Sequence, residues 1–98
     1  MRAIVQITPE ARQDIAEAFH WYERQERGLG REFVLCVETG LGKIRGAPRA
    51  YPQVYGNVRR LVLSRFPYGI LYVDGPGEIA VLAVFHARRD PEEWKSRI

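Results

Sequence analysis

The sequence lacks several features on which small proteins often depend. Cys36 is the single cysteine among 98 residues, so no intramolecular disulfide can form. Cysteine and histidine residues nowhere stand at metal-ligand spacing, which excludes a structural zinc site. No run approaches the ~18 apolar residues of a membrane span, and residues 1–6 lack the apolar run of a signal peptide. We therefore expect a cytoplasmic protein without metal, other cofactor or membrane contact, folded as one domain over residues 1–98.

Acidic residues are missing from one stretch of the chain. Residues 43–65 carry six bases and no acid, and residues 39–98 hold ten bases against five acids, whereas residues 1–38 hold five against seven. Such a block favours a polyanion or an acidic protein segment as partner. A solvated sheet edge is the equally good alternative, because the net charge of +3 is ordinary for a small domain. The six bases are Lys43, Arg45, Arg49, Arg59, Arg60 and Arg65.

The spacing of apolar residues in the first third predicts a strand and then a helix. Residues 2–7 alternate weakly, as a short first strand does. Thr8 then fits an N-cap and Pro9 the first helical position. Apolar residues follow at helical spacing, and Gly28-Leu29-Gly30 ends the helix. This apolar stripe consists of Ala11, Ile15, Ala18, Phe19 and Tyr22.

A second apolar stripe predicts a second helix, so that the two helices form a hairpin. Gly40 and Gly42 each cost about 1 kcal/mol relative to alanine, which predicts a frayed or bent last turn. Gly46-Ala47-Pro48 ends the helix. The stripe consists of Phe33, Val34, Val37, Leu41 and Ile44.

The remaining residues predict a three-stranded antiparallel meander. The strands are expected at residues 57–66, 68–74 and 78–86, with turns at Pro67-Tyr68-Gly69 and Gly75-Pro76-Gly77. The fold class is therefore α+β, in the order βααβββ, with the helical hairpin on a mostly antiparallel twisted sheet.

The last strand needs cover on both faces, because every side chain from Ile79 to Phe85 is apolar. The helical hairpin covers one face. Asp90-Pro91-Glu92 can cap a short C-terminal helical turn that carries Trp94. That tail, a second copy of the chain or another protein are the three candidates for the other face.

A series of motifs along nearly the whole chain resembles the RelE/ParE toxin superfamily, in particular its ParE-like (plasmid stabilisation) branch. Each motif is weak alone, whereas the RFPY strand end together with HxRRDPxxW is quite specific. The motifs are Trp21-Tyr22, Gly28-Leu29-Gly30, Phe33, Pro48, Tyr51-Pro52, Val54-Tyr55, Arg59-Arg60-Leu61, Arg65-Phe66-Pro67-Tyr68, Tyr72, Leu82-Ala83-Val84, His86-Ala87-Arg88-Arg89-Asp90-Pro91 and Trp94.

The resemblance implies the same fold and the toxin component of a type II toxin–antitoxin system. The expected partner is a cognate antitoxin, through which alone the toxin reaches operator DNA. The expected target is DNA gyrase, inhibited without obvious catalysis. The alternatives are a ribosome-dependent mRNA endonuclease, which acts on ribosome and mRNA, and a degenerate toxin that serves mainly as co-repressor.

Two positions favour the non-catalytic branch. Gly69 stands where the resemblance implies a ribonuclease arginine, and Trp94 stands where it implies a tyrosine. Metal-free RNA cleavage needs a base, an acid and cations at the phosphate. His86, Arg60 and Arg88 are the candidates if catalysis exists, although a histidine at the end of an apolar strand more often bonds a nearby carbonyl or carboxylate.

The residues expected to contact antitoxin or target are mostly cationic. Arg59 and Arg60 point to opposite faces of one strand, so one should be paired and the other should reach solvent. One of Arg88 and Arg89 should pair with a carboxylate such as Glu17 or Glu93, and the other should project towards the target. The full candidate set is Arg49, Tyr55, Arg59, Arg60, Arg65, Arg88, Arg89 and Trp94.

Overall fold

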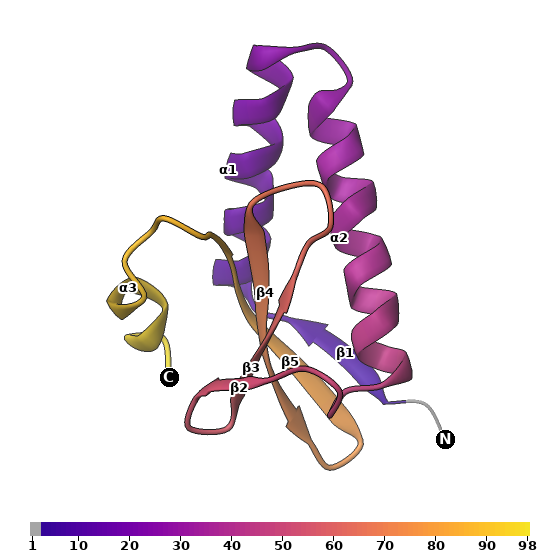
Figure 1. Cartoon of the computed structure of the whole chain (residues 1–98), viewed down its shortest axis with the longest axis vertical. Helices are drawn as coiled ribbons and strands as arrows, with labels where there is room; N and C mark the ends of the chain where they lie inside the picture. Colours follow the sequence, from indigo (N-terminus) through magenta and orange to yellow (C-terminus); the bar gives the residue numbers. More distant parts are fainter. Residues whose placement is uncertain (1–2) are drawn as a thin grey trace.

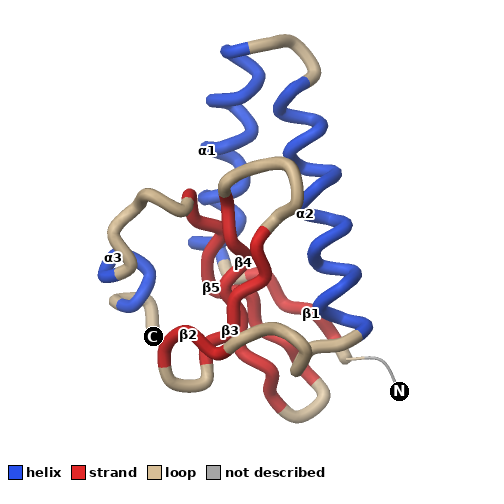
Figure 2. Tube along the Cα trace, in the orientation of Figure 1, coloured by secondary structure: helices blue, strands red, loops and turns tan. Residues whose placement is uncertain are grey.

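The structure is a computed structural model that describes residues 3–98. Arg2, which the sequence places in the first strand, lies outside these residues. Within them the chain forms a helical hairpin, a five-stranded sheet and a short C-terminal helix (Figures 1 and 2). The elements are β1 (Ile4–Ile7), α1 (Pro9–Gln25), α2 (Leu29–Gly46), β2 (Gln53–Tyr55), β3 (Val58–Val62), β4 (Tyr68–Gly75), β5 (Glu78–His86) and α3 (Glu92–Lys95).

The sheet has the strand order β1-β5-β4-β3-β2. The β3-β4-β5 meander is antiparallel, and β1 pairs in parallel with β5. This arrangement confirms the predicted α+β class, and it places β5, which is apolar from Ile79 to Phe85, between two neighbours.

The helical hairpin packs against one face of the sheet and extends beyond its end (Figure 1). The Thr8 Oγ1 atom accepts a hydrogen bond from the Ala11 N–H at 3.1 Å, so Thr8 and Pro9 begin α1 as predicted. An aromatic cluster joins the hairpin to the sheet, with Tyr22, Phe33 and Phe66 in mutual contact. This side holds the larger of two hydrophobic cores.

Helix α2 ends at Gly46, where the sequence predicts its end, and its last turn is helical rather than frayed. Gly40 instead permits close packing on the sheet. A Cβ atom there would lie 2.9 Å from Ile70 Cδ1 and 3.2 Å from Leu61 Cδ2. Its conformational cost is therefore offset by the contact of the helix backbone with β3 and β4.

The strands also differ from the prediction in their bounds and in their number. Strand β3 ends at Val62 rather than residue 66, and the following turn precedes Tyr68, which already belongs to β4. Strand β2 was not predicted, because three residues with an exposed, half-buried, exposed pattern carry little hydrophobic periodicity.

The C-terminal tail covers the second face of the sheet. Trp94 of α3 is 6% exposed and packs in a smaller core with Val58, Leu71, Ala83 and Phe85. The sequence offered the Trp94 tail, a second copy of the chain or another protein as cover for this face of the sheet. Within the described chain, the tail lies on it. Asp90 helps to begin α3 by accepting a hydrogen bond from the Glu92 N–H at 3.0 Å, as the sequence predicts.

One ion pair fastens the tail to α1 around the edge of β5. Asp14 is buried, and its two carboxylate oxygens accept hydrogen bonds from Arg97 at 2.7 and 3.0 Å. Asp14 also accepts from the Val84 N–H at 3.0 Å, and Arg97 donates to the Leu82 carbonyl at 3.1 Å. Both backbone groups lie beyond the paired part of β1, which pairs with β5 only as far as Val81.

Candidate functional site

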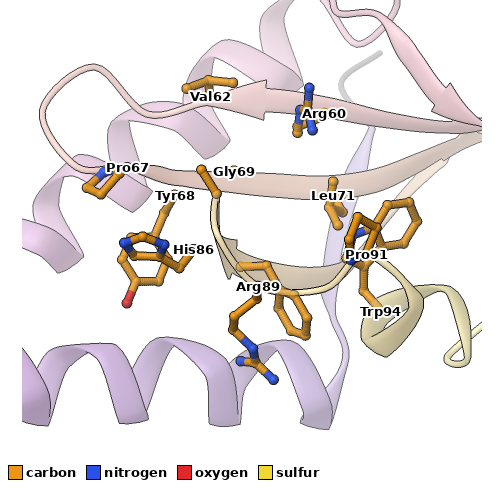
Figure 3. A pocket seen from close by; sticks show the side chains of 12 residues that line it. Arg60, Val62, Pro67, Tyr68, Gly69, Leu71, His86, Arg89, Pro91 and Trp94 are labelled. Carbon is orange, nitrogen blue, oxygen red and sulfur yellow. The ribbon is translucent and has the colours of Figure 1, made fainter.

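A groove of about 320 Å³ lies on the second face of the sheet, between the strands and the C-terminal segment (Figure 3). The floor is formed by β3, β4 and β5, and residues 87–94 form the opposite wall. Pockets for small-molecule ligands range from ~300 to ~1,000 Å³, so this groove is at the lower end of that range. It therefore suits one or two side chains rather than a large ligand. The lining residues are Arg60, Val62, Pro67, Tyr68, Gly69, Leu71, Phe85, His86, Ala87, Arg89, Pro91 and Trp94.

Five of the sequence-predicted candidates fall near this groove, and none of its lining residues is acidic. Arg60, His86, Arg89 and Trp94 line it, and Arg88 lies in the segment that forms its wall. The groove therefore gathers cationic side chains without a carboxylate among the lining groups.

Arg60 is held across Gly69 of the neighbouring strand. Val62 pairs with Gly69 and Arg60 with Leu71, so these side chains share one face. A Cβ on Gly69 would lie 2.9 Å from Arg60 Cδ and 3.0 Å from Arg60 Cγ. Because Gly69 has no side chain, the aliphatic part of the Arg60 side chain can lie over it on the sheet.

Arg59 points away from the groove, as the alternation of the strand predicts. Its guanidinium donates to the carbonyl oxygens of Tyr51 at 2.7 Å and Arg49 at 3.2 Å. It therefore fixes the chain between α2 and β2. Arg60 is the exposed neighbour, so the expectation of one paired and one solvated arginine is met.

Arg89 is oriented by two contacts within the C-terminal segment. Its guanidinium forms an ion pair with Glu93 at 2.6 Å and lies over the Phe85 ring at 3.8 Å from the centroid. Of the two predicted carboxylate partners, Glu93 rather than Glu17 is used. Arg88 is exposed, and its side chain makes no hydrogen bond or ion pair with residues 3–98.

His86 lies beside Tyr68, with ring centroids 5.2 Å apart (Figure 3). Its Nδ1 atom accepts a hydrogen bond from the Arg88 N–H at 3.0 Å. The expected partner was a carbonyl or carboxylate, but Nδ1 is an acceptor here, so a neutral His86 carries its proton on Nε2.

Tyr68 remains a phenol at neutral pH. Burial raises the pKa of its hydroxyl, and the nearby Tyr22 adds to this effect. The phenol is therefore no general base near neutrality.

The basic run at residues 43–65 does not form one surface. Arg49 pairs with Asp74 at 3.2 Å, and Arg65 pairs with Glu32 at 2.8 Å. These contacts lie at opposite ends of β4, since Arg65 precedes the strand and Asp74 is close to its end. An eight-residue strand separates such ends by over ~20 Å.

Tyr55 ends strand β2, next to the turn into β3, and is not itself among the lining residues. Its ring meets Trp94 edge-on, with centroids 6.0 Å apart, and Lys95 Nζ lies 4.7 Å from its centroid. The two aromatic candidates are thus brought together, with Trp94 buried and Tyr55 about half exposed.

The sequence interpretation missed the pair of Asp14 and Arg97, which positions one wall of the groove. Asp14 stands between Ala11 and Ala18 in the buried stripe of α1, where a lone carboxylate needs a partner. That position was the available clue. The identity of the partner was not predictable, because 83 residues separate the two.

No helix within residues 3–98 has the length and apolar character to cross a membrane. The same residues contain no cluster of three or more histidine, cysteine, aspartate or glutamate side chains that could hold a metal ion.

Comparison with known proteins identifies the family. A model of the ParE toxin of the type II toxin–antitoxin system parDE matches residues 5–91. Toxin ParE2 of Mycobacterium tuberculosis, in strains CDC 1551 and H37Rv, is 28% identical over 86 residues, which cover 87% of this chain and 82% of the relative. The chain belongs to the family of ParE toxins of type II toxin–antitoxin systems.

Two solved structures share the fold. The chromosomal ParDE toxin–antitoxin system from P. aeruginosa has a TM-score of 0.77 at 17% identity, and covers 86% of this chain and 95% of that chain. The toxin–antitoxin complex RelBE2 from Mycobacterium tuberculosis has a TM-score of 0.62 at 20% identity, with coverage of 88% and 92%. The helical hairpin on a mostly antiparallel sheet is therefore a fold that this chain shares with both structures.

Proposed function

We propose that this toxin arrests growth by binding DNA gyrase in the cytoplasm, and that a cognate antitoxin neutralises it. The observation that supports this proposal most directly is the chemistry of the groove, which offers cations but no lining group with a free basic atom. Arg60 and Arg89 supply positive charge, and His86 is the one histidine among the lining residues. This composition suits binding better than catalysis.

The endonuclease alternative demands more than these groups offer. Cleavage through the 2′-hydroxyl needs one group to remove a proton and another to protonate the leaving oxygen. His86 has one ring nitrogen engaged by the Arg88 N–H, and the pKa of Tyr68 is raised. Gly69 contributes no side chain. Because its pKa is raised, Tyr68 can only donate a proton, so His86 would have to be the base although its Nδ1 atom already accepts a hydrogen bond.

The partner is supported by the relatives rather than by the groove. The P. aeruginosa structure is a ParDE toxin–antitoxin system, and the RelBE2 structure is a toxin–antitoxin complex. This likeness supports a cognate antitoxin as partner, and we propose that it is the protein encoded beside this toxin. It contacts operator DNA, and the toxin reaches that DNA through it.

A supercoiling assay tests the proposal. Purified toxin is titrated into gyrase, relaxed plasmid and ATP, with and without the protein encoded by the neighbouring reading frame. We expect micromolar toxin to inhibit supercoiling and the neighbouring protein to restore it. Unchanged supercoiling refutes gyrase as the target.

Primer extension on translated mRNA separates the alternatives. Toxin-dependent cuts that vanish in His86→Ala and Arg60→Ala would establish the endonuclease. If neither assay responds and induction of the toxin alone leaves growth unchanged, the co-repressor alternative replaces both.

A further inference from the structure

Arg60 and Val62 form an exposed pair at the rim of the groove. They are two residues apart on β3 and so project from the same face. Val62 is 64% exposed, and Arg60 is exposed without a side-chain hydrogen bond or ion pair to any residue in the range 3–98. The Arg60 guanidinium therefore lies beside the exposed apolar side chain of Val62, and Pro67 adds further apolar surface.

The backbone beside this pair is an open sheet edge. The Arg60 N–H donates to Pro52 O at 3.1 Å, and the Leu63 N–H donates to Tyr68 O of β4 at 2.9 Å. Because successive N–H groups point alternately to the two sides of a strand, the Val62 N–H points away from β4. Strand β2 begins only at Gln53, opposite Arg59, so it does not extend as far as Val62. An edge of this kind accepts another strand.

The aromatic rings of the groove are not available for stacking on nucleobases. Phe85 is 4% exposed and has the guanidinium groups of Arg89 and Arg97 over its ring. Trp94 is 6% exposed, and Tyr68 packs against Phe33 and His86. Proteins that bind single-stranded nucleic acid depend on open aromatic faces. The groove therefore favours a protein segment.

We propose that the edge of β3 at residues 60–62 docks an extended acidic peptide segment of a protein partner. The segment adds a strand beside Val62, places a carboxylate at the Arg60 guanidinium and places an apolar side chain on Val62 and Pro67. In an extended strand those two side chains must be separated by one residue, since only alternate residues share a face. The recognised pattern is an acidic residue two positions from an apolar one.

This inference rests on the proposed function in one respect, namely that the protein acts by binding. It names a recognition surface and a peptide pattern, whatever the cellular target. The test below contains no gyrase, so its failure leaves the gyrase proposal standing, and loss of gyrase inhibition leaves the peptide result standing.

Synthetic peptides of equal composition test the pattern. In the first peptide the repeated unit is Glu-Thr-Leu-Thr, which places every glutamate and leucine on one face of an extended strand. In the second peptide the repeated unit is Glu-Leu-Thr-Thr, which has the same composition but places the glutamates and leucines on opposite faces. A third peptide has lysine in place of glutamate, and a single-stranded oligoribonucleotide is the fourth probe.

Two signals report on binding. The Trp21→Phe variant leaves Trp94 in the groove as the single tryptophan, so its emission reports occupancy. Hydrogen exchange of the Val62 amide, followed by NMR, reports strand pairing directly. We expect the first peptide alone to give saturable changes in both.

Matched variants assign the contacts. Arg60→Gln should weaken binding of the first peptide by about tenfold or more, the usual effect of losing a hydrogen bond to a charged group. Arg12→Gln removes an exposed arginine on α1 and should leave binding unchanged. Val62→Pro removes the N–H group that a docked strand would use, and it should abolish binding. Proline is tolerated where a strand N–H has no partner in the sheet, so the thermal midpoint should stay near that of the parent.

Several results would overturn the proposal. Equal binding of the reordered or lysine peptide would reject the strand register or the role of the charge. A response to the oligoribonucleotide alone would make the groove a nucleic-acid site. No change in Trp94 emission or Val62 amide exchange with any probe would also reject the proposal. Unchanged affinity of Arg60→Gln for the first peptide would reject it as well.

Discussion

Replacing Arg97 by glutamine tests whether one ion pair holds the C-terminal tail on the sheet. Arg97 donates two hydrogen bonds to Asp14 and a third to the Leu82 carbonyl. The carboxylate side chain is 4% exposed and the arginine side chain 20%. Because of this pairing, the pKa of Arg97 is raised above its ordinary value, mainly by the hydrogen bond to Asp14. The charge of Arg97 therefore persists at every usable pH.

The expected loss follows from the burial of the pair. Removing one member of a fully buried pair costs ~3–5 kcal/mol, because the other charge is left uncompensated. Asp14 keeps its hydrogen bond from the Val84 N–H, and Arg97 is partly solvated. We therefore expect Arg97→Gln to lower the free energy of unfolding by about 2–3 kcal/mol, somewhat below that range.

Urea unfolding in the Trp21→Phe background measures this effect. Far-UV circular dichroism gives the free energy, and Trp94 emission shows whether the tail has left its core. Arg49→Gln is the control, since it breaks an ion pair whose arginine side chain is 84% exposed and should cost about 0.5 kcal/mol or less. If Arg97→Gln costs no more than this control and Trp94 emission is unchanged, the ion pair does not hold the tail.

A double-mutant cycle tests whether the tail detaches as a unit. Replacing a buried tryptophan by alanine typically costs ~3–5 kcal/mol. If Arg97→Gln already releases the tail, Trp94→Ala in that background removes fewer contacts. The free energy of unfolding lost in the double variant should then be smaller than the sum of the two single losses by about 1 kcal/mol or more. Losses that add within about 0.5 kcal/mol would show that the two contacts act independently.

Two further predictions concern the helical hairpin. Gly40→Ala should destabilise by about 1–3 kcal/mol, because its Cβ would crowd Ile70, whereas Gly42→Ala has open space and should stabilise by about 0.5–1 kcal/mol; thermal unfolding that ranks them the other way would contradict the packing. The pKa of Glu23 is lowered from 4.5, chiefly by a hydrogen bond to the backbone of Gly28, so its stabilising effect is present above pH 4.5 and is lost as the pH falls through the lower folded-state value. Glu23→Gln should therefore be less stable than the parent at neutral pH and converge with it in acid, and a gap in urea midpoints that persists at about pH 3 would refute this.

The elements that the sequence predicted are those with strong local patterns. The cap at Thr8, both apolar stripes and the β3-β4-β5 meander depend on neighbours along the chain, and all are present. Strand β2 was missed because it depends on pairing with β3 rather than on its own periodicity. The end of α2 was predicted at Gly46, but the sequence did not reveal the packing that offsets the cost of Gly40, because that packing comes from Ile70, thirty residues later in the chain.

The candidate site was predictable in composition but not in arrangement. Charge alone grouped Arg49, Arg60 and Arg65 in one run, whereas two of them are in ion pairs near opposite ends of β4. Arg60 remains as the arginine of that run that lines the groove. The alternation rule identified Arg60 and Arg59 as opposite in direction, but only the fold shows that Gly69 makes room for the Arg60 stem.

The tail changes what a partner can do for this fold. The apolar strand β5 needs cover on two faces, and within the described chain the hairpin covers one and Trp94 covers the other. A partner that displaced the tail would first have to break the pair of Asp14 and Arg97. A partner that added to the edge of β3 would break nothing, because Val62 is already exposed and Arg60 has no ion-pair partner among residues 3–98. Addition at this edge therefore carries the smaller free-energy cost.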